Sequence, residues 1–139
     1  MIVLDTNVIS ALMKAEANPF IVDWLNRLPP QSVWTTTVTL FELQIGIERL
    51  RVSRRRHDLE QHLSRVLKDD IEERLLTFDR PAAEETAVLA ARRERVGRPI
   101  DFRDSMIAGI VMSRRAELAT RNVRHFADLD VPVIDPWTA

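Results

Sequence analysis

The sequence predicts an α/β fold with a mostly parallel central sheet. Short apolar runs that fit buried strands alternate with longer segments whose apolar residues recur at helical spacing. This alternation is typical of layered folds in which helices connect parallel strands. No repeat, linker or low-complexity segment divides the 139 residues, so we expect a single domain spanning residues 1–139.

The first half of the chain is predicted to contain two strands and four helices. Ile2–Leu4 is a short apolar run that fits a buried strand, and Asn18 followed by Pro19 is a typical helix start. The helix after the second strand has an apolar stripe formed by Leu40, Leu43, Ile47 and Leu50. The elements expected here are strands at 2–4 and 32–36, and helices at 6–13, from 19, at about 37–51 and around 59–67.

The second half repeats the alternation. Asp79 is a favourable cap for a helix with Pro81 in its first turn, and Gly97 is a favourable residue at which to end it. The elements expected here are strands at 75–77, 117–120 and 131–134, and helices between Asp79 and Gly97 and at 102–115.

Composition excludes several classes of protein. The chain has no cysteine, which rules out disulfides and thiolate metal sites and is compatible with a cytoplasmic location. No apolar run approaches the length of a membrane span, and no signal peptide is visible. Of the 20 basic residues only Lys14 and Lys68 are lysine, so 20 − 2 = 18 are arginine, whose planar group suits phosphate oxygens. The two arginine clusters, at 51–56 and 92–98, are interpreted as solvated helix faces.

Four oxygen-bearing side chains are the candidate functional residues. Chemistry in parallel sheets lies beyond the carboxyl ends of the strands, and Asp5 and Asn122 each follow a predicted strand. Asp104 lies in the first turn of an apolar helix, and Glu42 lies beside the apolar stripe of another. Each has an ordinary alternative as a helix cap, a turn residue or a half-exposed helix residue.

Convergence of the three carboxylates would require a cation or protonation. At about 5 Å separation and an effective dielectric near 20, three pairs repel by about 10 kcal/mol in total. An all-oxygen ligand set suits Mg²⁺ or Mn²⁺ rather than Zn²⁺. His57 and His62 would not share a helix face and His125 is isolated, so solvated histidines are a better interpretation than a zinc site.

Four segments in order resemble PIN domains, especially VapC toxins and their FitB-like relatives. They are residues 1–10 (MIVLDTNVIS), 39–46 (TLFELQIG), 101–108 (DFRDSMIA) and 120–126 (TRNVRHF), and the ending Asp135-Pro-Trp137 also fits. The resemblance spans nearly the whole chain. It implies a three-layer α/β/α fold, metal-dependent endoribonuclease activity as a toxin, and a VapB-like antitoxin partner.

The family's acidic positions correspond to Asp5, Glu42 and Asp104, which the resemblance implies as the metal site. Its fourth position corresponds to Asn122, where many relatives have Asp. Asn keeps an oxygen ligand but lacks the charge, which argues against a second tightly held metal. Asp101 is interpreted as a helix cap rather than as a ligand.

The mechanism expected is in-line hydrolysis of an RNA phosphodiester bond. Asp5 and Asp104 are the main ligands, Glu42 orients or deprotonates the attacking water, and Asn122 completes the shell. Candidate substrate contacts are Thr6, Asn7, Arg103 and Arg121, because the first two begin a helix and the arginines flank motif residues.

Other functions fit less well or stay open. An aspartyl phosphatase would need a second Asp where Asn7 stands, and a phospho-receiver would need a late lysine, but none follows Lys68. A catalytically inert PIN-fold binding module and a DNA-cutting enzyme with the same acidic site remain as alternatives.

Two surfaces are predicted to bind protein partners. Phe20, Trp24 and Leu25 are expected to anchor the antitoxin near the acidic site, because the two short helices have more large apolar residues than a thin edge needs. Ordinary core packing is the alternative for Trp24. Leu43, Ile47 and Leu50 are expected to be available for a homodimer, which the resemblance also suggests.

Overall fold

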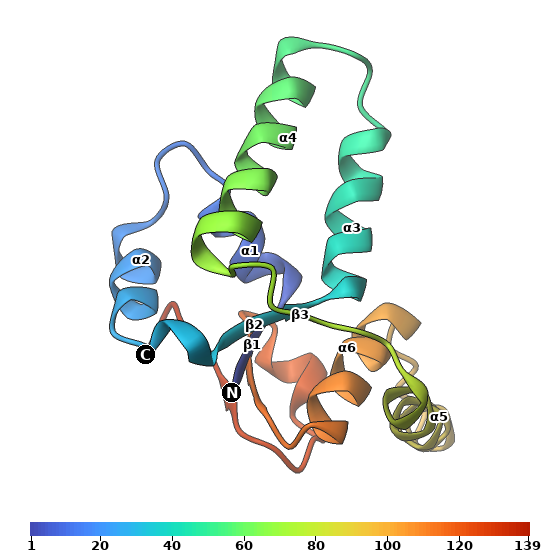
Figure 1. Cartoon of the computed structure of the whole chain (residues 1–139). Coiled ribbons are helices and arrows are strands. Elements are labelled where there is room, and N and C mark those ends of the chain that lie inside the picture. Colours follow the sequence, from blue (N-terminus) through green and yellow to red (C-terminus); the bar gives the residue numbers. More distant parts are fainter.

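The computed structural model describes residues 1–139 and contains one five-stranded, all-parallel sheet (Figure 1). The strand order is β3-β2-β1-β4-β5, so the first strand of the chain is the central one. Its Ile2 lies opposite Val33 of one neighbour and Glu117 of the other. The strands are β1 Ile2–Leu4, β2 Val33–Thr36, β3 Leu75–Leu76, β4 Glu117–Ala119 and β5 Val133–Ile134.

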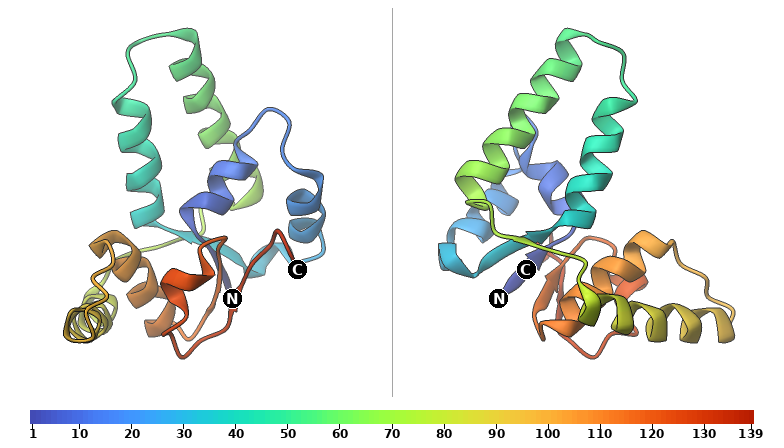
Figure 2. Two further views of the ribbon diagram at one scale, coloured as in Figure 1. Left: turned by 180° about the vertical axis from the view of Figure 1, so that it is seen from behind. Right: turned by 45° about the vertical axis from the view of Figure 1, so that its right-hand side comes forward.

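Six helices cover the two faces of this sheet. They are α1 Thr6–Leu12, α2 Pro19–Asn26, α3 Thr37–Glu48, α4 Arg54–Arg65, α5 Arg80–Arg95 and α6 Phe102–Ser113. Helices α1 to α4 lie on one side, and α5 and α6 lie on the other (Figure 2). Neighbouring strand residues point to opposite faces, so Leu4 packs in the core under α1 to α4 and Val3 in the core under α5 and α6. The predicted three-layer α/β/α architecture is confirmed.

Helices α3 and α4 form a hairpin that extends away from the sheet (Figure 1). The helix predicted for about 37–51 ends at Glu48, and Ser53 starts the next helix by accepting a hydrogen bond from the Arg56 N–H at 3.2 Å. The Arg56 side chain contacts Glu48 of α3 at 2.9 Å, which ties the two helices together, and Glu60 of its own helix at 3.0 Å. Helix α4 therefore begins at Arg54, five residues before Leu59, the first apolar residue used to predict it.

Two predicted partner surfaces need correction. Trp24 is 6% exposed and Ile47 is 4% exposed, because both pack in the core between the sheet and helices α1 to α4. Neither is available to another chain. Phe20 is 77% exposed, and Leu25, Leu43 and Leu50 keep part of their surface.

Helices α5 and α6 pack closely across Gly109. Asp79 caps α5 by accepting a hydrogen bond from the Ala82 N–H, and Gly97 follows the helix with φ +70°, as predicted. A Cβ at Gly109 would collide with the Thr86 hydroxyl and would lie 2.7 Å from the Ala82 carbonyl oxygen. The second helix of this layer can approach α5 only because residue 109 lacks a side chain. No helix of the protein combines the length and apolarity needed to cross a membrane.

Gly109→Ala is expected to lower the free energy of unfolding by about 1–3 kcal/mol, since the added methyl group overpacks the α5–α6 contact. The matched control is Gly46→Ala in α3, where an added Cβ meets nothing within 4 Å. That change should be neutral or stabilise the protein by up to about 1 kcal/mol through helix propensity. Urea denaturation of both variants measures the difference, and equal effects would contradict the close approach at Gly109.

Candidate active site

Asp5 lies directly after β1, where its side chain is 2% exposed. One carboxylate oxygen accepts the Thr6 backbone N–H at 2.8 Å, and the other accepts the Thr120 hydroxyl at 2.7 Å. Burial raises the pKa of Asp5, and these two hydrogen bonds oppose the shift. Asp5 therefore caps α1, and its buried carboxylate is held by Thr6 after β1 and by Thr120 after β4.

Glu42 approaches from α3. The Thr6 hydroxyl donates to its Oε1 at 2.9 Å, and the Arg103 guanidinium lies 4.0 Å from its Oε2. Its side chain is 20% exposed. Burial is the main cause that raises the pKa of Glu42, while Thr6 and Arg103 lower it.

Asp104 approaches from the first turn of α6. Its Oδ2 lies 3.3 Å from Nδ1 of His125, and the side chain is 24% exposed. Burial raises the pKa of Asp104, the contact with His125 lowers it, and the negative charge of Glu42 raises it again.

The three carboxylates affect one another electrostatically. The charge of Asp104 raises the pKa of Asp5, the charge of Asp5 raises that of Glu42, and the charge of Glu42 raises that of Asp104. The structure thus brings the three predicted acids into one site at the carboxyl edge of the sheet.

These acids do not form a closed cage for an ion. No group of three or more Asp, Glu or His side chains is arranged so that it could hold a metal directly. The donor set nevertheless fits Mg²⁺, because that ion usually keeps several waters and binds through only one or two carboxylates. Three carboxylates with raised pKa values also gain from a positive charge between them.

A family model described as PIN domain matches residues 2–132. The chain belongs to the PIN domain family. A relative of this PIN domain, the VapC ribonuclease Y4jK of Sinorhizobium fredii (strain NBRC 101917 / NGR234), is 31% identical over 137 residues, which are 99% of this chain and 98% of that protein. The resemblance seen in the four sequence motifs is confirmed.

Solved structures agree with the fold of this PIN domain. FitAcB from Neisseria gonorrhoeae is 31% identical and superimposes with a TM-score of 0.86 over 100% of both chains. VapBC-5 from Mycobacterium tuberculosis, a member of the VapBC family of toxin–antitoxin systems, is 27% identical with a TM-score of 0.69 over 95% of both chains.

The remaining predicted site residues of the PIN domain lie around the acids in different roles. Asn122 is exposed after β4, and its backbone N–H donates to the Thr120 hydroxyl at 3.0 Å, but its side chain contacts none of the three acids. Thr6 and Asn7 hold Glu42 and Asp5, and the Thr6 N–H donates to Asp5, so that N–H is not free for a phosphate. Their contact with substrate stays a prediction.

The two predicted arginines differ in how firmly they are held. Arg103 pairs with Asp101 at 3.1 Å, and Asp101 caps α6 as expected by accepting the Arg103 N–H. The guanidinium of Arg121 lies 4.9 Å from the centre of the Trp137 ring. Both remain predicted substrate contacts.

Sequence reasoning missed two groups of this PIN domain that contact the acids. His125 was interpreted as a solvated histidine, but the turn after β4 places it against Asp104. Thr120 is fully buried, and its hydroxyl donates to Asp5 and accepts hydrogen bonds from Asn7 and from the Asn122 N–H. The position of Thr120, two residues before the predicted Asn122 at the end of a strand, was the available indication for it.

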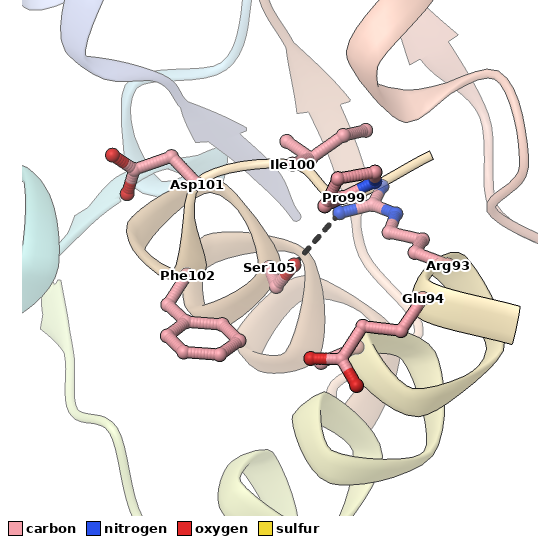
Figure 3. A pocket seen from close by; sticks show the side chains of 8 residues that line it. Arg93, Glu94, Pro99, Ile100, Asp101, Phe102 and Ser105 are labelled. Carbon is pink, nitrogen blue, oxygen red and sulfur yellow. Dashed lines mark hydrogen bonds between the residues drawn. The ribbon is translucent and has the colours of Figure 1, made fainter. Parts of the chain in front are cut away.

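Arg93 corrects the interpretation of the second arginine cluster. It is 2% exposed, and its guanidinium forms a two-oxygen contact with Asp128, with both distances 2.9 Å. It also donates to the His125 carbonyl oxygen at 2.7 Å and to the Ser105 hydroxyl at 2.9 Å (Figure 3). Ser105 follows Asp104 on α6, and the His125 ring contacts the Asp104 carboxylate. Arg93 therefore holds both the start of α6 and the turn after β4, the two segments that position this acid.

The raised pKa of Asp104 predicts the effect of removing its charge. The folded state keeps the Asp104 proton to a higher pH than the unfolded chain does, so the ionised carboxylate costs stability as the pH rises through the folded pKa. In EDTA, Asp104→Asn should melt at the same temperature as the parent or up to about 4 °C higher at pH 7.5, with a smaller difference near pH 4.

Asp101→Asn is the matched control with the opposite sign. Its contacts with Arg103 lower the pKa of Asp101, so its charge stabilises the fold above the unfolded pKa. This variant should melt at or below the parent temperature at pH 7.5. Calorimetry across the pH range distinguishes the two, and an Asp104→Asn protein that melts lower at pH 7.5 in EDTA would contradict the crowding of the three acids.

Proposed function

We propose that this PIN domain is a metal-dependent endoribonuclease that acts as the toxin of a type II toxin–antitoxin pair. The observation that supports it most directly is the group formed by Asp5, Glu42 and Asp104, three largely buried carboxylates that raise one another's pKa. Its relatives add the chemical class, since one is named a VapC ribonuclease and another belongs to a family of toxin–antitoxin systems.

The cofactor proposed is Mg²⁺, with Mn²⁺ as a substitute, because all the side chains of the site offer oxygen. Asp5 and Asp104 would hold it, with Glu42 in its outer shell or bound directly. When bound, such an ion would polarise the scissile phosphate and lower the pKa of a water molecule.

The other chain groups have roles that follow from their contacts. Burial keeps the Glu42 carboxylate more basic than in water, which suits a group that takes a proton from the attacking water. Thr6 holds Glu42 in place at 2.9 Å, and Thr120 holds Asp5 at 2.7 Å. Arg103 stands beside Glu42, where it could contact the phosphate, and Asn122 at the end of β4 would complete the site.

Asp5→Asn and Asp104→Asn should each lower Mg²⁺-dependent cleavage of RNA by at least about 100-fold while leaving the protein folded, since each removes one proposed ligand charge. Asp130→Asn, an exposed carboxylate outside the site, is the control and should cut at the parent rate. The assay is cleavage of a labelled single-stranded RNA with EDTA, Mg²⁺ or Mn²⁺, and a matched DNA strand tests the choice of nucleic acid. A parent protein that cuts neither strand would support an inert binding module.

The partner proposed is a VapB-like antitoxin, and RNA in the cytoplasm is the proposed substrate. A cleft of about 550 Å³ between the end of α1 and α4 lies in the same helical layer as α2, which carries Phe20. Lys14, Arg54 and Arg55 line it together with apolar Met13 and Leu59. This mixture suits a partner segment that has both acidic and apolar side chains. We also propose a homodimer, to which Leu43 and Leu50 can still contribute surface.

Phe20→Ala is expected to weaken antitoxin binding by about tenfold, because an exposed aromatic side chain at an interface typically contributes more than 1 kcal/mol. Val88→Ala is the control, since Val88 is 63% exposed on α5 on the opposite face of the sheet. Titration calorimetry with a VapB-like antitoxin measures both. Equal affinity for the Phe20→Ala and parent proteins would remove Phe20 from the interface.

A further inference from the structure

A cavity of about 330 Å³ lies between the end of α5 and the start of α6 (Figure 3). It adjoins the acidic site. Asp101, at its rim, pairs with Arg103, which reaches to within 4.0 Å of Glu42. Asp104 directly precedes Ser105, which lines the cavity. A strand of RNA whose phosphate lies at the three acids can therefore place a neighbouring base in this cavity.

The walls of the cavity suit a flat aromatic group. Phe102 forms one side and is 64% exposed, so its ring is accessible to a ligand in the cavity. Pro99 and Ile100 form the facing side (Figure 3). Proteins that bind unpaired RNA bases commonly stack them on exposed aromatic rings and read their hydrogen-bonding edges.

The polar groups of the cavity have unused hydrogen-bonding capacity. Glu94 forms no ion pair or side-chain hydrogen bond, although arginines flank it on both sides, and its carboxylate points toward the Phe102 ring (Figure 3). The buried Arg93 side chain uses four of its five N–H donors, on Asp128 twice, His125 and Ser105. Its remaining N–H belongs to Nη1, the atom that contacts Ser105 in the cavity.

We propose that this cavity binds an unpaired guanine base next to the bond that is cut, an inference that rests on the proposed ribonuclease function. Guanine presents two adjacent donors, N1–H and the N2 amino group, which match the two oxygens of the Glu94 carboxylate. Its O6 accepts the free N–H of Arg93, and Phe102 stacks on its face. Adenine, cytosine and uracil each present an acceptor where guanine presents a donor, so the carboxylate disfavours them.

The first experiment sequences the ends produced from an RNA pool with randomised positions around the cut. The parent should prefer guanine at one fixed position by at least about tenfold. Glu94→Gln should lose that preference, because its amide presents only one acceptor, and Phe102→Ala should lower kcat/KM about tenfold for guanine-containing RNA. Glu85→Gln and Val88→Ala, both exposed on α5 outside the cavity, are the matched controls and should keep the parent preference.

The second experiment measures binding in EDTA, where no cleavage occurs. Five-nucleotide RNAs that differ only in the central base are titrated while backbone amide shifts of residues 93–105 are followed by NMR. Tighter binding of the guanine-containing RNA, lost in Glu94→Gln, supports the cavity even if the parent cuts no RNA, which would overturn only the proposed function. A parent that cuts RNA with equal use of all four bases, or with a preference unchanged in Glu94→Gln, overturns the guanine site and leaves the proposed function intact.

Discussion

The hydrogen bond between the Thr120 hydroxyl and the Asp5 carboxylate is the contact on which the site depends. It joins the ends of β1 and β4, two adjacent parallel strands, at 2.7 Å. Without it, a carboxylate that is 2% exposed would lose a main compensation for burial. Thr120 also accepts hydrogen bonds from Asn7 and the Asn122 N–H, so one hydroxyl joins the first and the fourth motif segments at the sheet edge.

The position of Asp104 depends on the buried side chain of Arg93. Its two-oxygen contact with Asp128 keeps the turn after β4 against α5, and its contact with Ser105 keeps α6 in register with both. A buried guanidinium is costly unless its donors are used, and here four contacts offset that cost. The position of Asp104 therefore depends on Arg93, which binds both the neighbouring Ser105 and the backbone of His125.

Local patterns predicted most of the fold and the acids, but not the contacts between distant segments. The strand at Ile2–Leu4, the helix cap at Asp79 and the helix end at Gly97 were each predicted from a few neighbouring residues, and all three predictions are confirmed. The burial of Arg93 depends on Asp128, 35 residues away, although its spacing from Leu89 continues the buried face of α5. Trp24 allowed two interpretations, because its three-residue spacing from buried Ile21 indicated the core while its size suggested an interface, and the structure places it in the core.

The strand order also determines when the protein can become active during its own synthesis. β1 is the central strand and is translated first, but its neighbour β4 begins 115 residues later, at Glu117. At about 5–20 residues per second, Thr120 is added to the chain about 6–23 s after Asp5. Chains that end before Thr120 contain all three acids but lack the hydroxyl that holds Asp5 and the histidine that contacts Asp104. The contacts that position the acids are therefore complete only after residue 125 has been synthesised.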